Sequence, residues 1–471
     1  MTADPMTTLW SGRFDKAPDP AAFDFGISFG VDRALFEDDV TGSLAWADAL
    51  QAAGVLSAAD GAAIGAALEA ILDQGRRHPE WISGPDEDVH SFVERQVVER
   101  VGDAGRRLHT GRSRNEQVSL DLRLYLRRRI PLLQHAVVDV VAACAALAER
   151  AGTAIMPSYT HLRRAQPVLV AHFFLSHAAA LRRDAARLAA AADEADALPL
   201  GSGAIAGTSY PVDTAFLARR LGFSRVVLNS MDASSDRDFA ASFLFAASLT
   251  MVHLSRLAED LIIFTGEEHA FFNLADESAT GSSMMPQKKN PDPLELVRGK
   301  TGRVVGALTG LLVTLKALPT GYNKDLQEDK EAVFGAEATL AASLRAVEAV
   351  VSRLTVNDAR TGEAASGLLL ATDVADYLVS RGMPFRRAHE VVGAMVRRLL
   401  AEGRDFSALT LAEWREASEM FGDDAPLAAT ALASVSARRT PQSTSPDAVR
   451  AALAESHKWV DEMRRGLRAR K

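Results

Sequence analysis

Residues 236–268 read DRDFAASFLFAASLTMVHLSRLAEDLIIFTGEE, and this stretch decides the class of fold. Wound as a helix, it is apolar on nearly every side. Its large apolar residues are Phe239, Phe243, Leu244, Phe245, Leu249, Met251, Leu254, Leu257, Leu261, Ile262 and Ile263. A helix that is hydrophobic all round must be buried all round. One chain rarely supplies so much cover, so we expect copies of this chain to bury the helix.

Helix signals also dominate the rest of the chain, which is rich in alanine, leucine, arginine and glutamate. Ser57 and Asp60 form a capping-box pattern before a helix that is expected to run to Gly75. Thr410 and Glu413 repeat the pattern. Alternating strand patterns with hairpin dipeptides are essentially missing. The sequence therefore predicts an all-α protein.

Three regions of the chain differ in texture. Residues 1–112 hold an irregular segment and short helices, residues 113–362 contain very long helical stretches, and residues 363–471 return to shorter capped helices. A chain of 471 residues exceeds one small core. We predict an N-terminal domain, a central domain built as a long-helix bundle, and a small C-terminal helical domain.

Composition limits the class of protein. The net charge of -8 and a pI near 5.8 argue against a nucleic-acid binder, which usually carries a basic face. We find no signal peptide and no uninterrupted apolar run long enough to span a bilayer, so we expect no membrane partner and a cytoplasmic location. The single cysteine, Cys144, cannot form an internal disulfide and is expected to be a small buried hydrophobe.

Motifs for bound cofactors are missing or misplaced. Gly201-Ser202-Gly203 followed by Gly207 resembles a dinucleotide-binding pattern, but it follows a helical run and is interpreted as a loop. No phosphate-binding loop, zinc-ligand spacing or metalloprotease helix motif occurs, and the eleven histidines are scattered. The sequence predicts chemistry without a metal or a redox cofactor.

Three polar segments lie between the predicted helices. They are HTGRSRNEQ at residues 109–117, SYTHLRRAQP at 158–167 and TGSSMMPQKKNPDP at 280–293. Each is dense in groups that bind anions or move protons. Each segment also has a purely structural explanation. The first could be the exposed start of a helix, the histidine of the second could be structural, and the serine of the third could be an ordinary turn residue. Glycine at the start of the third segment and its three prolines favour a mobile loop held in one shape at its far end.

The third segment resembles the signature loop of the fumarase/aspartase superfamily. Gly281, Ser282, Met285, Lys288 and Asn290 match the pattern in full. Within the superfamily, GSSMMPQKKNPD followed by LELVR is similar to the argininosuccinate lyase family. Fumarase, aspartase and adenylosuccinate lyase carry different residues in the middle of this loop.

Other segments share the resemblance, which covers essentially the whole chain. They are LWSGRF at residues 9–14, LHTGRSRNEQV at 108–118, SYTHLRRAQP at 158–167, NSMDASSDRDF at 229–239 and GYNKDLQEDKE at 321–331. The resemblance implies a fumarase/aspartase-like, three-domain all-α fold. It also implies a homotetramer whose long helices form one central bundle, with active sites shared between subunits.

The activity that the resemblance implies is β-elimination of argininosuccinate to arginine and fumarate, the last step of arginine biosynthesis, without a cofactor. Ser282 is the residue that the resemblance assigns to proton abstraction, and positive surroundings would favour its oxyanion. The intermediate is an aci-carboxylate with two negative charges on one group. Lys288, Asn290 and the backbone N–H groups of the turn at 281–283 would stabilise that charge.

His161 is the candidate that protonates the leaving nitrogen, directly or through water. Glu295 has two interpretations, which are compatible. In the family the matching glutamate pairs with the histidine and orients it. Asp292, Pro293 and Glu295 also form an N-cap, a first-turn proline and a capping-box acid.

A further set of residues is placed around the substrate by the resemblance. It comprises Ser28, Asn115, Thr160, Asn290, Tyr322, Gln327 and Lys330. Arg114 and Arg237 are candidates for its carboxylates, because arginine suits bidentate carboxylate contacts. Ser28 lies in a segment, Phe25–Ser28, that matches the family loosely.

Two alternatives stay open. Another fumarate-releasing lyase, such as adenylosuccinate lyase, would share the signature loop, although Gln287-Lys288-Lys289 and the segment at 321–331 speak against it. A crystallin-like protein that keeps the fold without activity is the other, although every catalytic position matches here. A substrate panel distinguishes them.

Overall fold

The computed structural model describes residues 19–469, so the segment LWSGRF at residues 9–14 lies outside the described part. The chain divides into two compact units, each assembled from separate stretches of sequence. The first unit contains residues up to 133, residues 187–248 and residues 303–339. The second unit contains residues 134–186, residues 249–302 and residues from 340 onward.

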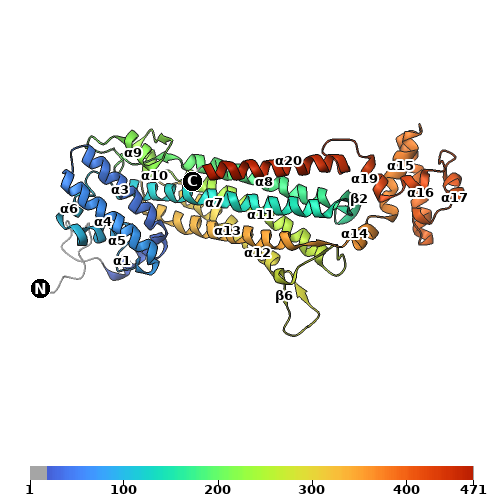
Figure 1. The fold of residues 1–471 in the computed structure, drawn as a ribbon, viewed down its shortest axis with the longest axis horizontal. Coiled ribbons are helices and arrows are strands. Elements are labelled where there is room, and N and C mark those ends of the chain that lie inside the picture. Colours follow the sequence, from blue (N-terminus) through green and yellow to red (C-terminus); the bar gives the residue numbers. More distant parts are fainter. Residues whose placement is uncertain (1–18, 470–471) are drawn as a thin grey trace. The chain divides into compact units, whose positions relative to one another are not determined.

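The described chain is mostly helical, as predicted, and its elements are labelled in Figure 1. The long helices are α7 (Arg114–Ala151), α8 (Val170–Ala195), α11 (Asp238–Thr265), α12 (Asp292–Leu315), α13 (Asp329–Arg353) and α20 (Pro446–Ala469). Shorter helices in the first unit are α1 (Pro20–Gly26), α2 (Phe29–Asp32), α3 (Phe36–Ala52), α4 (Ala58–Arg77), α5 (Val89–Val101), α6 (Asp103–Arg106), α9 (Thr214–Leu221) and α10 (Ser230–Ser235). Those in the second unit are α14 (Asp358–Ala364), α15 (Ala371–Ser380), α16 (Phe385–Glu402), α17 (Leu411–Ala417), α18 (Ala425–Ala428) and α19 (Ala431–Ala437).

The predicted helix caps are present. The Ser57 hydroxyl accepts a hydrogen bond from the backbone N–H of Asp60, and α4 continues two residues past the expected Gly75. Thr410 and Glu413 make both reciprocal bonds of a capping box at the start of α17. Because these caps satisfy N–H groups that the first turn leaves unpaired, they fix where the helices begin.

Short strands correct the expectation of an all-α chain without hairpins. The main pair is β1 (Ile155–Thr160) and β2 (Arg163–Leu169), which are antiparallel. The others are two residues each: β3 (Ala197–Leu198) with β4 (Arg225–Val226), β5 (Phe272–Asn273) with β8 (Thr355–Val356), and β6 (Thr280–Gly281) with β7 (Lys289–Asn290). The hairpin β1–β2 escaped detection because its turn is His161-Leu162, which lacks the usual Asn-Gly signal.

The single chain buries a large part of α11. Phe243, Leu244 and Leu254 are fully buried within this single chain, and only Phe245 among its phenylalanines is largely exposed, at 53%. The single chain therefore supplies much of the cover, while Leu249, Ile262 and Ile263 are only half-buried, and burial against copies of the chain stays a prediction. Exposed apolar side chains also lie on α12, where Leu296, Leu312 and Val313 are 50–58% exposed.

Two helices also modify the expectation that nothing is long and apolar enough to span a membrane. By length and composition α7 and α11 pass that test among the described residues. However, 61% and 56% of their apolar windows are buried inside the protein. Both therefore fit core helices of a globular protein.

The C-terminal helices share an apolar cluster of their own. Leu378, Leu399, Trp414 and Phe421 are almost completely buried there, and every member of the cluster falls between residues 370 and 425. Cys144 on α7 is also buried, as predicted, and burial raises the pKa of its thiol to about 12. It is therefore an inert, neutral side chain near neutral pH.

Candidate active site

The signature loop is a hairpin whose base is held by polar contacts. Thr280 pairs with Asn290 and Gly281 with Lys289 in the short strands β6 and β7. The Thr280 hydroxyl donates to the Asp292 carboxylate in the first turn of α12. In Figure 1 this loop, next to the label β6, extends away from the helices. Strand pairing thus holds the C-terminal end of the loop, the end that was predicted to keep one shape. Helix α12 begins at Asp292, one residue earlier than the capping pattern predicted.

Ser282 lies at the start of the loop with its hydroxyl facing backbone donors. Its Oγ accepts hydrogen bonds from the backbone N–H groups of Met284 at 3.3 Å and Met285 at 3.1 Å. Donors aimed at an oxygen favour its charged form. These two donors belong to residues 284 and 285 and lie just beyond the turn at 281–283, whose N–H groups were expected to face the substrate.

The two lysines of the loop have different environments. Lys289 Nζ donates to Leu274 O and to Asp276 Oδ1, both at 2.6 Å, and so ties the base of the hairpin to the preceding segment. Lys288 is exposed, and its backbone N–H donates to Met285 O at 3.0 Å. Lys288 is therefore the lysine that can reach a ligand.

Thr160 and His161 lie at the tip of the β1–β2 hairpin. His161 and Leu162 both adopt left-handed backbone angles, with φ of 53° and 56°, which a two-residue turn of this kind requires. Thr160, His161 and Glu295 are all exposed in the single chain. Among residues 19–469, no hydrogen bond joins His161 to Glu295, so their pairing stays a prediction.

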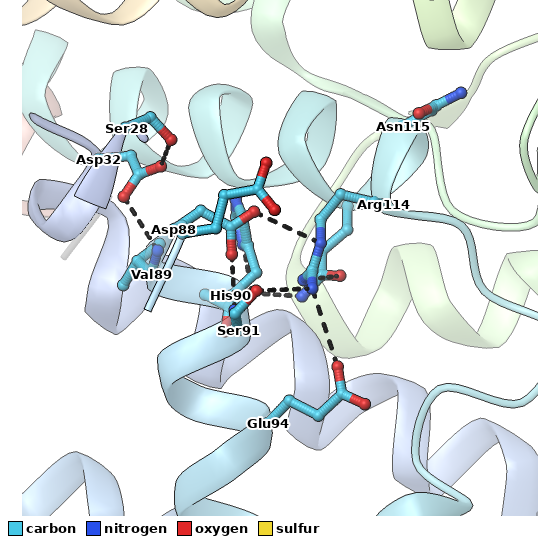
Figure 2. Close-up of polar contacts among 12 residues, drawn as sticks. Ser28, Asp32, Asp88, Val89, His90, Ser91, Glu94, Arg114 and Asn115 are labelled. Atoms are coloured by element: carbon cyan, nitrogen blue, oxygen red, sulfur yellow. Dashed lines mark hydrogen bonds and ion pairs between the residues drawn. The ribbon is translucent and has the colours of Figure 1, made fainter. Parts of the chain in front are cut away.

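In the first unit, the loop that carries Ser28 contacts the loop before α5 and the segment before α13. The Ser28 hydroxyl donates to Asp32, whose other carboxylate oxygen accepts the backbone N–H of Val89 at 3.0 Å, as Figure 2 shows. The Gln327 side chain donates to Gly26 O at 3.3 Å. Ser28 and Gln327, which are far apart in sequence, therefore lie close together.

Arg114 and Asn115 occupy the first turn of α7. Arg114 forms ion pairs with Asp88 at 3.6 Å and with Glu94 at 3.8 Å (Figure 2). Burial would raise the pKa of Asp88, but the charge of Arg114 and bonds from Ser91 lower it to about 2. Arg114 is thus committed to acids of its own unit, which weakens its case as a substrate ligand.

The loop at residues 199–213 packs against the start of α7, and it contains the glycine pattern that was interpreted as a loop. Residues 199–213 contain no helix or strand, and Gly201, Gly203 and Gly207 all have positive φ. Glu116 accepts the backbone N–H of Gly201 at 2.7 Å, and the side chain of Asn115 donates to the carbonyl of the same loop at residue 204 at 3.3 Å. Asn115 is half-buried at this position.

Tyr322, Lys330 and Arg237 form the remaining group of the first unit. Lys330 and Arg237 are buried, and both donate to Asp329. Burial lowers the pKa of Lys330, and burial raises the pKa of Tyr322, on which the charges of Arg237 and Asp329 also act. The structure thus brings these three together, whereas Ser282, Lys288 and Asn290 belong to a loop of the second unit.

Comparison with known proteins shows the family to which this chain is related. Residues 12–306 match the family model described as lyase, and residues 368–436 match the one described as argininosuccinate lyase C-terminal. The argininosuccinate lyase of Desulforudis audaxviator is 45% identical over 459 residues, which cover 97% of this chain and 100% of that protein. That of Moorella thermoacetica is 45% identical and covers 98% of this chain and 99% of its own. The chain belongs to the argininosuccinate lyase family.

Among solved structures, an EDDS lyase in complex with formate has a TM-score of 0.84 and 26% identity, and the match covers 97% of this chain and 93% of that one. The resemblance read from the signature loop is therefore confirmed at the level of family and fold.

A buried charged cluster beside the argininosuccinate lyase segments was not predicted. His90 Nδ1 lies 2.9 Å from Asp39 Oδ1 and 3.2 Å from Asp121 Oδ2, and all three side chains are at most 1% exposed. Burial alone would lower the pKa of His90, but hydrogen bonds to Asp121 and Asp39 raise it to about 10. Ligand atoms of these three residues lie within 4.8 Å of one another, which a divalent cation could also bridge. The protonated imidazole supplies one positive charge between these two side chains.

The cluster predicts a pH-dependent stability. His90→Asn is expected to lower the free energy of unfolding by about 3–5 kcal/mol near neutral pH, because it leaves the buried Asp39 carboxylate without its cation, while burial and the charge of Asp39 raise the pKa of Asp121 to about 8. Since the folded pKa of about 10 exceeds the ordinary value of 6.5, this contribution is complete below pH 6.5 and is lost as the pH rises toward 10. Thermal unfolding between pH 6 and pH 10 should show a steeper decline for the wild type than for the variant. An equal decline in both, or a neutral effect like that of the exposed His78→Asn control, would contradict the prediction.

Proposed function

We propose that this protein is an argininosuccinate lyase that splits argininosuccinate into arginine and fumarate by β-elimination. The observation that carries the proposal is the signature loop, in which the Ser282 hydroxyl accepts two backbone N–H groups at the start of a hairpin. The family membership and the 45% identity over nearly the full length support the same conclusion.

In this proposal Ser282 removes a proton from the carbon next to a carboxylate of the substrate. Lys288 and Asn290 stabilise the aci-carboxylate that forms, because fixed donors act most strongly where charge develops. The carbon–nitrogen bond then breaks as the double bond of fumarate forms. His161, directly or through a water molecule, gives a proton to the leaving nitrogen, and Glu295 orients His161.

Substrate binding is assigned to the groups of the first unit together with Thr160. Ser28, Asn115, Tyr322, Gln327 and Lys330 surround the substrate in this proposal. Supporting it, Gln327 and the Ser28 loop are joined by a hydrogen bond, and Lys330 is adjacent to Arg237 through Asp329. Arg237 is the better carboxylate candidate of the two arginines, because its buried Nη2 has no hydrogen-bond partner among residues 19–469, whereas Arg114 pairs with two acids.

The proposal includes a homotetramer with shared active sites. The signature loop and the His161 turn are exposed in one chain, with Met284 87% exposed. The exposed apolar residues of α12 favour that helix as the contact between copies. On the same helix, a Cβ added at Gly302, Gly306 or Gly310 would meet nothing within 4 Å, which leaves room for a neighbouring helix. The three-domain division at residues 112 and 362 and a cytoplasmic location belong to the same proposal.

The substrate assignment predicts a selective turnover. Purified protein is expected to release fumarate from argininosuccinate with no added metal or nucleotide, and to leave adenylosuccinate unchanged. A substrate panel followed by ultraviolet absorbance of fumarate and by quantification of arginine measures this directly. Turnover of adenylosuccinate in place of argininosuccinate would move the protein to the alternative lyase, and inactivity on the whole panel would favour a crystallin-like paralogue.

A further inference from the structure

Asp329 is a fully buried carboxylate that accepts hydrogen bonds from two cations at once. It occupies the first turn of α13 and is 0% exposed. Arg237 Nε donates to its Oδ2, and Lys330 Nζ donates to its Oδ1 at 2.6 Å. Both cations are buried as well. The carboxylate therefore fixes where the guanidinium and the ammonium lie relative to each other.

Some N–H groups of Lys330 and Arg237 have no acceptor among residues 19–469. Lys330 Nζ has three N–H bonds, of which one is given to Asp329 and one to Leu326 O at 3.3 Å. Arg237 Nη1 donates to Asp236 O at 2.7 Å. Its Nη2 is buried and has no hydrogen-bond partner among residues 19–469. A buried donor without a partner is unfavourable, so this position calls for an acceptor from a ligand.

The charges around these donors favour an anionic acceptor. Arg237 and Lys330 together with Asp329 leave one positive charge in a buried place. Asp32, which also acts on Lys330, already accepts from the Ser28 hydroxyl and from the backbone of Val89, and burial raises its pKa. A carboxylate of a ligand would both satisfy the donors and balance the charge.

We propose that Asp329 is a positioning residue, which holds Lys330 and Arg237 as a paired binding site for one carboxylate of the substrate. This inference rests on the proposed function, since argininosuccinate supplies that carboxylate. Asp329 does not touch the substrate itself. Its effect is to keep two cations, from segments about ninety residues apart, at a spacing that one carboxylate can bridge.

The test is Asp329→Asn, which keeps the shape of the side chain and removes its charge. We expect the KM for argininosuccinate to rise by about tenfold or more, with kcat changed by less than about threefold, because the loss affects binding in the ground state and the transition state alike. Inhibition by arginine and by fumarate is measured in the same variant. Whichever product binds more weakly contains the carboxylate that Lys330 and Arg237 hold.

A matched control exists on the same helix. Glu337 lies about two turns further along α13, is 3% exposed, and accepts from Arg129 Nη2 at 2.7 Å and from the Tyr125 hydroxyl. Glu337→Gln removes the same charge from a buried carboxylate whose ion pair, with the partly exposed Arg129, includes none of the proposed substrate ligands. It should lower the melting temperature as Asp329→Asn does and leave KM unchanged. Asp329→Glu, which retains the charge and displaces it slightly, serves if Asp329→Asn does not fold, and should give a smaller rise in KM.

The outcomes separate the two proposals. A wild-type protein without argininosuccinate turnover overturns the proposed function and this inference with it. An active wild type, combined with an unchanged KM in the folded Asp329 variants, overturns the inference alone. An equal rise in KM for Glu337→Gln also overturns it, because the effect would then come from general loosening of α13.

Discussion

Replacing Ser282 by alanine is expected to lower turnover by roughly four orders of magnitude, to the background of the assay, while substrate binding remains. The variant removes the base that the mechanism requires and little else. Ser282 is only partly buried in a loop, so its loss costs the core nothing. Fumarate release measures the first effect, and binding of argininosuccinate measured by calorimetry tests the second.

The neighbouring Ser283→Ala is the matched control. Ser283 is exposed, belongs to the same hairpin, and lacks the pair of backbone donors that Ser282 Oγ accepts. Its turnover should stay within a few-fold of the wild type. Substantial residual activity in Ser282→Ala together with loss of activity in Ser283→Ala would transfer the role of base to Ser283.

Two inactive variants are expected to rescue each other if sites are shared. In the proposed tetramer, the regions of Asn115 and Lys330 come from one subunit, Thr160-His161 from another and the Ser282 loop from a third. When His161→Asn and Ser282→Ala chains are unfolded and refolded together, random mixing should restore roughly a quarter of the sites, since each site samples two segments independently. Asparagine suits position 161 because it tolerates the left-handed turn.

The controls are each variant refolded alone, which should gain no activity, and sedimentation of the mixture. Mixed tetramers that remain inactive would show that both loops of a site come from one chain. A monomer in sedimentation would remove the reason for the exposed apolar face of α12 and would contradict the assembly itself.

Local sequence patterns predicted the helices well because their signals are local. The caps at Ser57 and Thr410 depend on residues three positions apart, and the structure contains both. The part of α11 that the chain itself covers could not be predicted, since periodicity says that a face is buried but not what buries it. The hairpin at His161 was missed for a related reason: its turn residues have positive φ without being glycine or asparagine.

Sequence alone could propose candidate site residues where they lie in one continuous motif, as in the Ser282 loop, and their roles stay predictions. Clusters assembled from distant segments were not predictable. Asp39, His90 and Asp121 come from three helices, and the contact of Arg237 with Asp329 joins residues 92 positions apart. No single stretch of sequence records that these charges meet, so only the fold shows which ones are paired.

The apolar cluster around Trp414 has a consequence for how the chain folds. Its members come from one continuous segment, residues 370–425, so they meet without closing a long loop. The first unit, in contrast, must collect stretches from both sides of residues 134–186 and 249–302. Local contacts form faster than distant ones. We therefore expect residues 370–425 to fold early, although they lie late in the sequence. Their hydrophobic cluster would form before the long helices assemble.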